Sequence, residues 1–192
     1  MANSKIIIVE GPQGAGKTTI TDYIRNIVPY TNLYRLSGTS DSSKAGKIKA
    51  KKMYEDLMNY MENLENMSIN LLFDRTFFTE EIYCRLGFKE YSFTDEYEKL
   101  MARLSKMDFD IYYITLYLRN TEEYEKRLKR EGKASVKYAK FNIQSSINQQ
   151  NAYLKMAEEI KNKYRKINVI NYDTSRDTKI TFEEIKNLLM QQ

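Results

Sequence analysis

Short apolar runs alternate with amphipathic stretches along the whole chain. The apolar runs are rich in β-branched and aromatic residues and predict strands at 5–9, 32–36, 69–73, 111–118 and 167–171. Elsewhere apolar residues recur at helical spacing, which predicts helices that cover 17–27, 54–64, 143–164 and 182–189. A chain in which strands and helices alternate favours an α/β fold, with a parallel sheet and helices on both of its faces.

The segment between the first strand and the first helix matches the pattern G-x-x-x-x-G-K-[ST] over residues 11–18. Its glycines let the backbone turn N–H groups inward, and the following helix N-terminus favours negative charge, so the segment predicts a phosphate site. We expect Lys17 to contact the β- and γ-phosphates of a nucleotide and the Thr18 hydroxyl to bind Mg²⁺. The nucleotide-binding residues expected here are Gly11, Gln13, Gly14, Ala15, Gly16, Lys17, Thr18 and Thr19.

A carboxylate and an arginine, Asp74 and Arg75, follow the third predicted strand. The carboxyl ends of parallel strands meet at one edge of a sheet, so both side chains should face the phosphate loop. Asp74 has three open roles: it could orient Mg²⁺ through water, accept a proton from the attacking group, or cap the strand. Arg75 could clamp a phosphate.

A basic segment follows the fourth predicted strand. Arg127 and Arg130 are three residues apart and should share one face of a helix that we expect Thr121 to cap. We expect about 130–141 to form a mobile lid, with the two arginines stabilising charge on a transferred phosphoryl group. The alternative is a solvated helix with Glu–Lys pairs on its surface.

The amino-acid composition limits the number of domains and excludes several kinds of catalytic and metal site. The 192 residues suit one domain, which we expect to span 1–192. The lack of histidine and the single cysteine, Cys84, exclude histidine catalysis, an internal disulfide and a cysteine-based zinc site. A lone thiol is typical of a reducing compartment, so we expect a cytoplasmic protein. We expect neither a signal peptide nor a membrane span, because the first strand begins at once and no apolar run is long enough.

The net charge of +5 suits anionic ligands such as nucleotides and is too small to indicate a nucleic-acid surface. The basic run 44–52 is interpreted as a solvated helix face, with the edge of a phosphate-rich site as the alternative.

These motifs together resemble the thymidylate kinase and deoxynucleoside kinase group of P-loop nucleotide kinases. Residues 9–19 resemble the family's first strand and phosphate loop, 73–75 its Asp/Glu-Arg motif, and 171–175 the loop that holds adenine. The resemblance implies a P-loop NTPase three-layer sandwich with a five-stranded parallel sheet. It also implies ATP and Mg²⁺ as cofactors, contacts of Asp173 and Thr174 with the nucleotide, and a possible homodimer.

The acceptor is less well defined than the donor. In thymidylate kinases a Pro-Gly-Gly turn follows the second strand, and here the turn after Arg35 is shorter and lacks the proline. The resemblance implies that Arg35 and Arg75 bind the acceptor, with Tyr54 as the candidate aromatic contact. It favours phosphoryl transfer to a deoxynucleoside monophosphate, and the alternative acceptor is a nucleoside 5′-hydroxyl.

Two other classes are disfavoured by the residues. A GTPase switch needs an N-K-x-D motif, and the segment 162–165 lacks its aspartate. A nucleic-acid-dependent ATPase or a polynucleotide kinase needs an extended basic groove with interleaved aromatic residues, for which the run 44–52 is the only sign.

Overall fold

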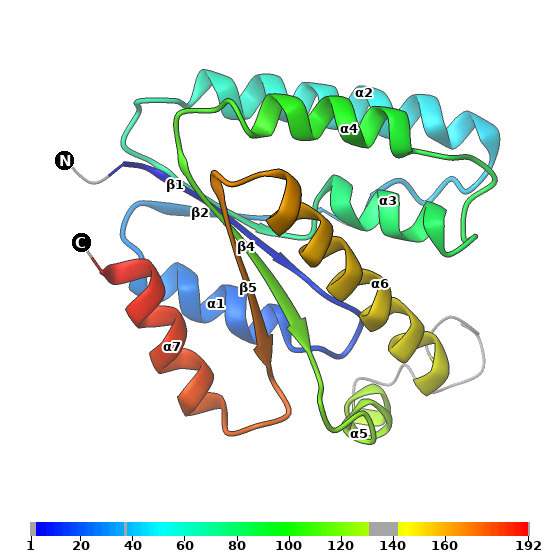
Figure 1. Ribbon diagram of the computed structural model, residues 1–192, viewed down its shortest axis with the longest axis vertical. Helices are drawn as coiled ribbons and strands as arrows, with labels where there is room; N and C mark the ends of the chain where they lie inside the picture. The colour runs from blue at the N-terminus through cyan, green and yellow to red at the C-terminus, as the bar shows by residue number, and fades with distance from the viewer. Residues whose placement is uncertain (1–2, 37, 131–141, 192) are drawn as a thin grey trace.

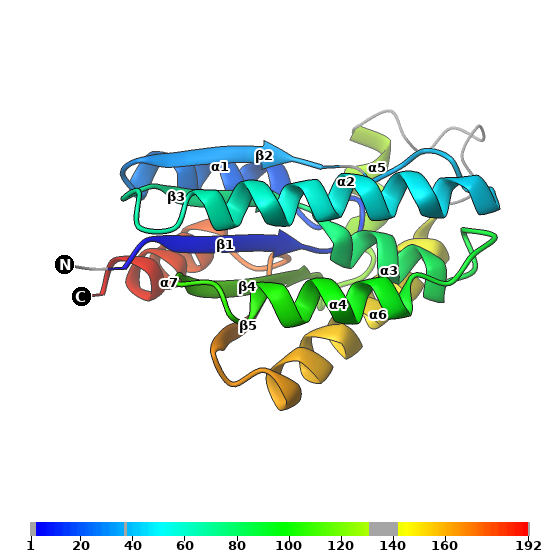
Figure 2. The ribbon, with the colours of Figure 1, turned by 90° about the horizontal axis from the view of Figure 1, so that it is seen from above.

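The computed structural model describes residues 3–36, 38–130 and 142–191, and its centre is a sheet of five parallel strands (Figure 1). Their order across the sheet is β2-β3-β1-β4-β5, so β1 is the central strand (Figure 2). The strands are β1 (Lys5–Glu10), β2 (Thr31–Arg35), β3 (Asn70–Asp74), β4 (Asp110–Tyr117) and β5 (Ile167–Asp173).

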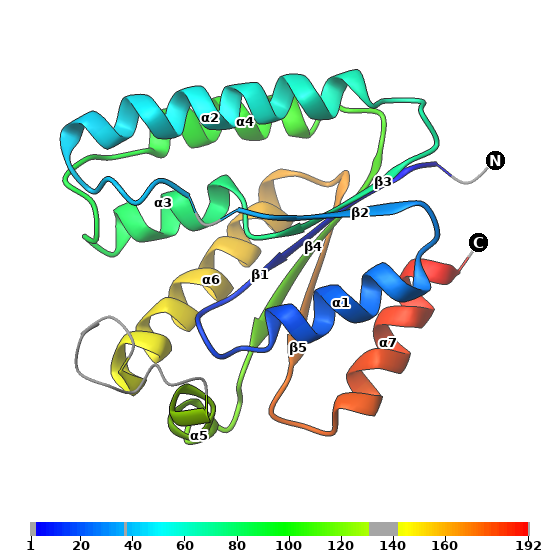
Figure 3. The same ribbon diagram turned by 180° about the vertical axis from the view of Figure 1, so that it is seen from behind.

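Helices cover both faces of the sheet, which makes a three-layer sandwich. Helices α1 and α7 lie on one face and α2, α3, α4 and α6 on the other, while α5 lies beyond the carboxyl ends of the strands (Figure 3). The helices are α1 (Lys17–Ile27), α2 (Lys44–Asn63), α3 (Phe77–Arg85), α4 (Thr94–Leu104), α5 (Glu123–Arg130), α6 (Ile143–Lys163) and α7 (Thr178–Met190).

The two cores follow from the two-residue period of a strand. Along β1, Ile6 and Ile8 pack in the core shared with α2, α3, α4 and α6, and Ile7 and Val9 pack in the core shared with α1 and α7. All four side chains are at most 1% exposed. A strand covered on both faces has to be apolar throughout, which is why this run lacks alternation.

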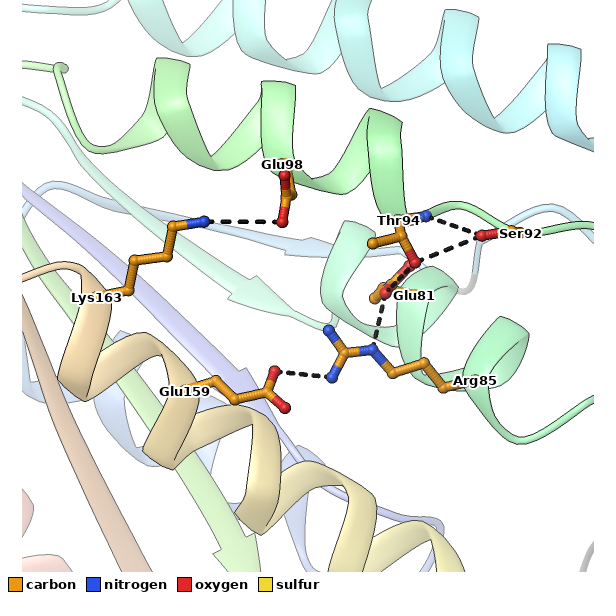
Figure 4. Close-up of polar contacts among 7 residues, drawn as sticks. All are labelled: Glu81, Arg85, Ser92, Thr94, Glu98, Glu159 and Lys163. Carbon is orange, nitrogen blue, oxygen red and sulfur yellow. Dashed lines mark hydrogen bonds and ion pairs between the residues drawn. The ribbon is translucent and has the colours of Figure 1, made fainter.

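Polar contacts join three of the helices on the larger face (Figure 4). The buried carboxylate of Glu81 on α3 accepts hydrogen bonds from Arg85 Nε at 2.8 Å and from Thr94 Oγ1 of α4 at 2.9 Å. Arg85 also donates to Glu159 of α6 at 2.8 Å. These contacts join α3 to α4 and to α6.

The predicted fold class is confirmed, with differences at the level of single elements. The structure contains two helices, α3 and α4, that the sequence analysis does not predict. The fifth strand is longer than predicted and includes Asp173. Helix α2 begins at Lys44, so the basic run forms its first half. There Lys49 and Lys52 pair with Asp41 and Asp56, as expected of a solvated helix face.

One matched pair of substitutions tests the burial pattern. Ile8 is 1% exposed in β1 and Ile48 is 73% exposed on α2. We expect Ile8→Ala to lower the free energy of unfolding by about 2–5 kcal/mol through lost burial and a cavity. The same truncation at Ile48 should change it by about 0.5 kcal/mol or less. Urea denaturation of both variants measures this, and equal losses would contradict the assigned core.

Candidate functional site

A cavity of about 810 Å³ opens at the carboxyl edge of the sheet. Its volume is within the range typical of ligand sites. It is lined by the phosphate loop, by the ends of β2 and β3, by α5 and by the β5–α7 connection. The predicted site residues that line it are Gln13, Gly14, Gly16, Lys17, Thr18, Thr19, Arg35, Asp74, Arg75, Arg127, Arg130 and Thr174.

The phosphate loop is curled between β1 and α1. Gly14 and Gly16 have φ of 86° and 93°, which a residue with a side chain rarely adopts, and Gly16 is the N-cap of α1. The Lys17 ammonium donates to the carbonyl oxygen of Pro12 at 2.8 Å, so the side chain lies back along the loop. A curled loop backbone with a lysine at a helix N-terminus is the arrangement that the predicted phosphate site requires.

Gly11 and Ala15 shape the loop without lining the cavity. A Cβ at Gly11 would lie 2.7 Å from the carbonyl oxygen of Leu116, so only glycine lets the loop pass this close to β4. Ala15 is fully buried, and its carbonyl oxygen accepts a hydrogen bond from Thr174 Oγ1 at 2.6 Å. Contact between the loop and the end of β5 is therefore direct.

The turn after β3 places an arginine in a strained conformation. Arg75 has φ of 69°, a left-handed value that costs a non-glycine residue about 1–2 kcal/mol. Its backbone N–H donates to Val9 O at 3.1 Å. Its guanidinium donates to Tyr83 Oη at 3.2 Å and to Gln13 Oε1 at 3.4 Å. The turn thus brings the Arg75 side chain to the phosphate loop.

Asp74 and Arg35 lie together at the ends of neighbouring strands. Asp74 is 8% exposed, and its carboxylate is 3.4 Å from Arg35 Nε. Arg35 also pairs with Asp22 of α1 at 2.7 Å. The Arg35 guanidinium is therefore shared between two carboxylates at the rim of the cavity.

Helix α5 packs directly on the phosphate loop. Arg127 donates to the carbonyl oxygens of Gly14 at 3.1 Å and Thr174 at 2.6 Å. The helix is anchored by Tyr124, whose hydroxyl donates to Gln150 Oε1 of α6. The same amide oxygen accepts from Leu118 N at 2.8 Å. Just before the helix, Asn120 Oδ1 accepts from Glu122 N at 3.3 Å, and the carbonyl oxygen of the predicted cap residue Thr121 accepts from Tyr124 N at 3.1 Å.

Arg130 is the last described residue before the gap at 131–141. It lines the cavity. The rest of the predicted lid lies outside the described residues, so the lid stays a prediction.

Two further predicted residues, Tyr54 and Asp173, do not line the cavity. Tyr54 is fully buried between the rings of Phe77 and Phe93, because it shares the apolar face of α2 with Met58 and Met61. This corrects its assignment as an acceptor contact.

Asp173, the last residue of β5, accepts hydrogen bonds from Arg119 N at 3.0 Å and Ser175 N at 2.9 Å. Its carboxylate therefore fixes the strand end, and Thr174 is the residue that reaches the cavity.

Glu10, at the end of β1, is a residue that the sequence analysis missed. Its side chain is fully buried, with Oε1 accepting from Thr76 N at 2.8 Å and Oε2 accepting from Thr79 Oγ1 at 2.7 Å. Burial raises the pKa of Glu10 to about 7, against the effects of these two hydrogen bonds and of the Arg75 and Lys17 charges. The sequence does contain a feature that points to Glu10, because a carboxylate directly follows the apolar run of a strand that is buried on both faces.

The described residues contain no group of three or more His, Cys, Asp or Glu side chains that could hold a metal ion. Within the same ranges, each helix is too short or too polar to cross a membrane.

Solved structures of three proteins align with almost the whole chain. Thymidylate kinase from Candida albicans superposes with a TM-score of 0.66 at 15% identity, covering 98% of this chain and 93% of that one. Deoxyadenosine kinase from M. mycoides with bound dATP gives a TM-score of 0.65 at 17% identity, covering 97% and 99%. YorR from Bacillus subtilis, in complex with phosphorylated GDP, gives 0.65 at 18%, covering 96% and 95%.

The chain has the P-loop nucleotide kinase fold. The predicted fold is thereby confirmed, while identities of 15–18% leave activity and substrate to be argued from the site. No protein-family model and no curated protein matches the chain.

The buried Glu10 carboxyl makes stability depend on pH. Its pKa is about 7 in the folded protein against an ordinary value of 4.5, so the folded state binds this proton more tightly. Stability that Glu10 contributes below pH 4.5 should therefore be lost as pH rises to about 7, at a cost of about 3 kcal/mol.

Glu10→Gln removes this titration. We expect the variant to gain stability relative to the native protein between pH 5 and pH 8. Urea denaturation of both proteins at the two pH values measures the change. A difference in unfolding free energy that is the same at both values would show that Glu10 titrates normally.

Proposed function

We propose that the chain is an ATP-dependent kinase that transfers the γ-phosphoryl group to a deoxynucleoside monophosphate. The observation that carries this is the arrangement of cations around one cavity. Lys17 comes from the phosphate loop, Arg127 and Arg130 from α5, and Arg35 and Arg75 from the ends of β2 and β3. A phosphoryl-transfer site must hold two anionic partners and neutralise the charge that passes between them, and cations on opposite sides of the loop suit that task.

The donor lies on the loop and on the α5 side in this proposal. The loop backbone and Lys17 would bind the ATP phosphates, and Thr174 would contact the nucleotide near the end of β5. Arg127 already contacts the loop at Gly14 O, so its guanidinium is within reach of a phosphate bound there. The kinases of similar fold support the use of ATP and a divalent cation.

The oxygen ligands that the cavity offers fit Mg²⁺ better than a metal ion held by many protein ligands. Mg²⁺ usually takes one or two protein oxygen ligands and completes its shell with water and substrate phosphates. Thr18, which is exposed at the start of α1, would bind it directly, and Asp74 would hold it through water. When bound, the ion neutralises phosphate charge.

The acceptor lies on the side of β2 and β3. Arg75 presents two guanidinium nitrogens beside Gln13 and Tyr83, and a phosphate can be gripped by two such nitrogens at once. Arg35 would share this task by exchanging Asp22 or Asp74 for the acceptor phosphate.

The second candidate acceptor is a nucleoside 5′-hydroxyl. It is favoured by the pairing of Arg35 with Asp22 and Asp74, which already neutralises that cation. Asp74 would then be placed to accept the hydroxyl proton. Both acceptor classes occur among the proteins of similar fold. A cytoplasmic location and a homodimer accompany the proposal as predictions.

Phosphoryl transfer is tested by incubating the protein with ATP, Mg²⁺ and each nucleoside, each monophosphate and single-stranded DNA. We expect one nucleotide class to be phosphorylated, and Lys17→Ala to lower kcat by at least about 100-fold because a transition-state cation is lost. Lys52→Ala on the exposed face of α2 is the matched control. Native turnover in Lys17→Ala, or ATP consumption that depends only on DNA, would contradict the proposal.

Arg35→Ala separates the two acceptors. If the acceptor carries a phosphate, kcat/KM for that acceptor should fall by at least about tenfold, while KM for ATP changes little. Arg25→Ala, at an exposed position in the last turn of α1, is the matched control. A loss below about twofold in Arg35→Ala, roughly 0.4 kcal/mol, would favour the nucleoside kinase.

A further inference from the structure

The Asp74–Arg75–Thr76 turn is held by hydrogen bonds to the ends of two strands, β1 and β2. Asp74 O accepts from Leu36 N at 3.1 Å, and Arg75 N donates to Val9 O at 3.1 Å. The third bond is from Thr76 N to the Glu10 carboxylate at 2.8 Å. Of these three, the Glu10 bond is the one made by a side chain, so it depends on residue type and on protonation.

The bond from Thr76 N to Glu10 matters because the neighbouring residue, Arg75, has a strained backbone. A left-handed conformation in a non-glycine residue persists only where surrounding contacts hold it. Glu10 accepts a hydrogen bond from Thr76, the residue that follows Arg75 in the chain. It also accepts one from Thr79, in the first turn of α3. The backbone on the carboxyl side of Arg75 is therefore attached to the end of β1.

We propose that Glu10 is a positioning residue whose ionised carboxylate holds the strained turn and so directs the Arg75 guanidinium into the cavity. The proposal deepens the proposed function, because it rests on the assignment of Arg75 to the acceptor. Glu10 itself does not line the cavity and acts through Arg75.

The contacts of Glu10 suit an ionised carboxylate. Its two oxygens lie 2.8 Å from Thr76 N and 2.7 Å from Thr79 Oγ1, and both of these groups can donate to it. Thr79 Oγ1 also lies 2.8 Å from Tyr153 Oη. A hydrogen bond to an ionised carboxylate is charge-assisted and therefore stronger than one to a neutral acceptor.

The charges that face Glu10 come from every neighbouring element. Arg75 after β3 and Lys17 of α1 favour its ionised form. Tyr54 of α2, Tyr113 of β4 and Tyr153 of α6 are neutral near pH 7, since burial raises the pKa of each. Burial of Glu10 opposes ionisation and raises its pKa to about 7. The ionised form is thus populated most fully above neutral pH.

Glu10→Gln is the direct test of the charge. Glutamine has nearly the same size and can still accept from Thr76 N, but through a weaker neutral hydrogen bond and without a negative charge to attract Arg75. We expect KM for the best acceptor to rise about tenfold and KM for ATP to change by less than about twofold. The native enzyme should also lose acceptor kcat/KM as pH falls through about 7, and the variant should lack this pH step.

Glu81→Gln is the matched control, because Glu81 is an equally buried carboxylate that accepts from Arg85 and Thr94 (Figure 4), and these three residues do not line the cavity. It should leave both KM values and the pH step unchanged. A residue with only a structural role would lower stability without separating the two KM values, and that result at Glu10 would overturn the proposal.

A second measurement needs no substrate. The Nε–H signal of Arg75, assigned in NMR spectra by its loss in Arg75→Lys, should shift with pH in the native protein with a midpoint near 7. Glu10→Gln should abolish that shift and Glu81→Gln should keep it. An unshifted native signal would overturn the positioning role even if Glu10→Gln failed to fold. If no acceptor is phosphorylated, the proposed function fails while this measurement still decides the role of Glu10.

Discussion

The pairing of β1 with β3 and β4 is the interaction on which the site depends. It places β1 at the centre of the sheet, buries it on both faces and sends the phosphate loop out at the middle of the carboxyl edge. The neighbouring strand β3 then delivers Asp74 and Arg75 to one side of that loop. On the other side, β4 leads to α5 and its arginines. An open parallel sheet forms its ligand crevice at this edge for the same reason.

Positive charge is gathered at this edge at a cost to the resting protein. Arg35 is held by two carboxylates, and Arg127 by two carbonyl oxygens. Arg75 has a strained backbone, and Glu10 carries a carboxyl whose ionised form is penalised by burial. Under the proposed function, the guanidinium groups of Arg35 and Arg127 would exchange these protein partners for phosphate oxygens. Local instability of this kind is typical of binding sites rather than of cores.

Several features were open to prediction because they rest on local pattern. The loop motif at 11–18 predicts its own backbone shape, and the apolar period predicts most strands to within one or two residues. Asp74 and Arg75 could be expected at the cavity because the carboxyl ends of parallel strands meet at one edge, and Arg127 and Arg130 because their spacing puts them on one helix face; all four line the cavity. Tyr54 was predicted to contact the acceptor, but it lies in the core. The spacing of an aromatic residue on an amphipathic helix does not distinguish a core position from a ligand contact. Asp173 was misplaced because its strand continues to that residue.

The sequence by itself determined the fold class, the phosphate loop and the residue types gathered at the sheet edge, since these depend on periodicity and on a contiguous motif. Only the tertiary structure decided which partners those residues have. The pairing of Arg35 with Asp22 and Asp74, and the burial of Glu10 against Thr76 and Thr79, join segments that are distant in the chain. Such contacts are set by strand order and helix packing. The sequence pattern does not give the spatial distance between residues that are far apart in the chain.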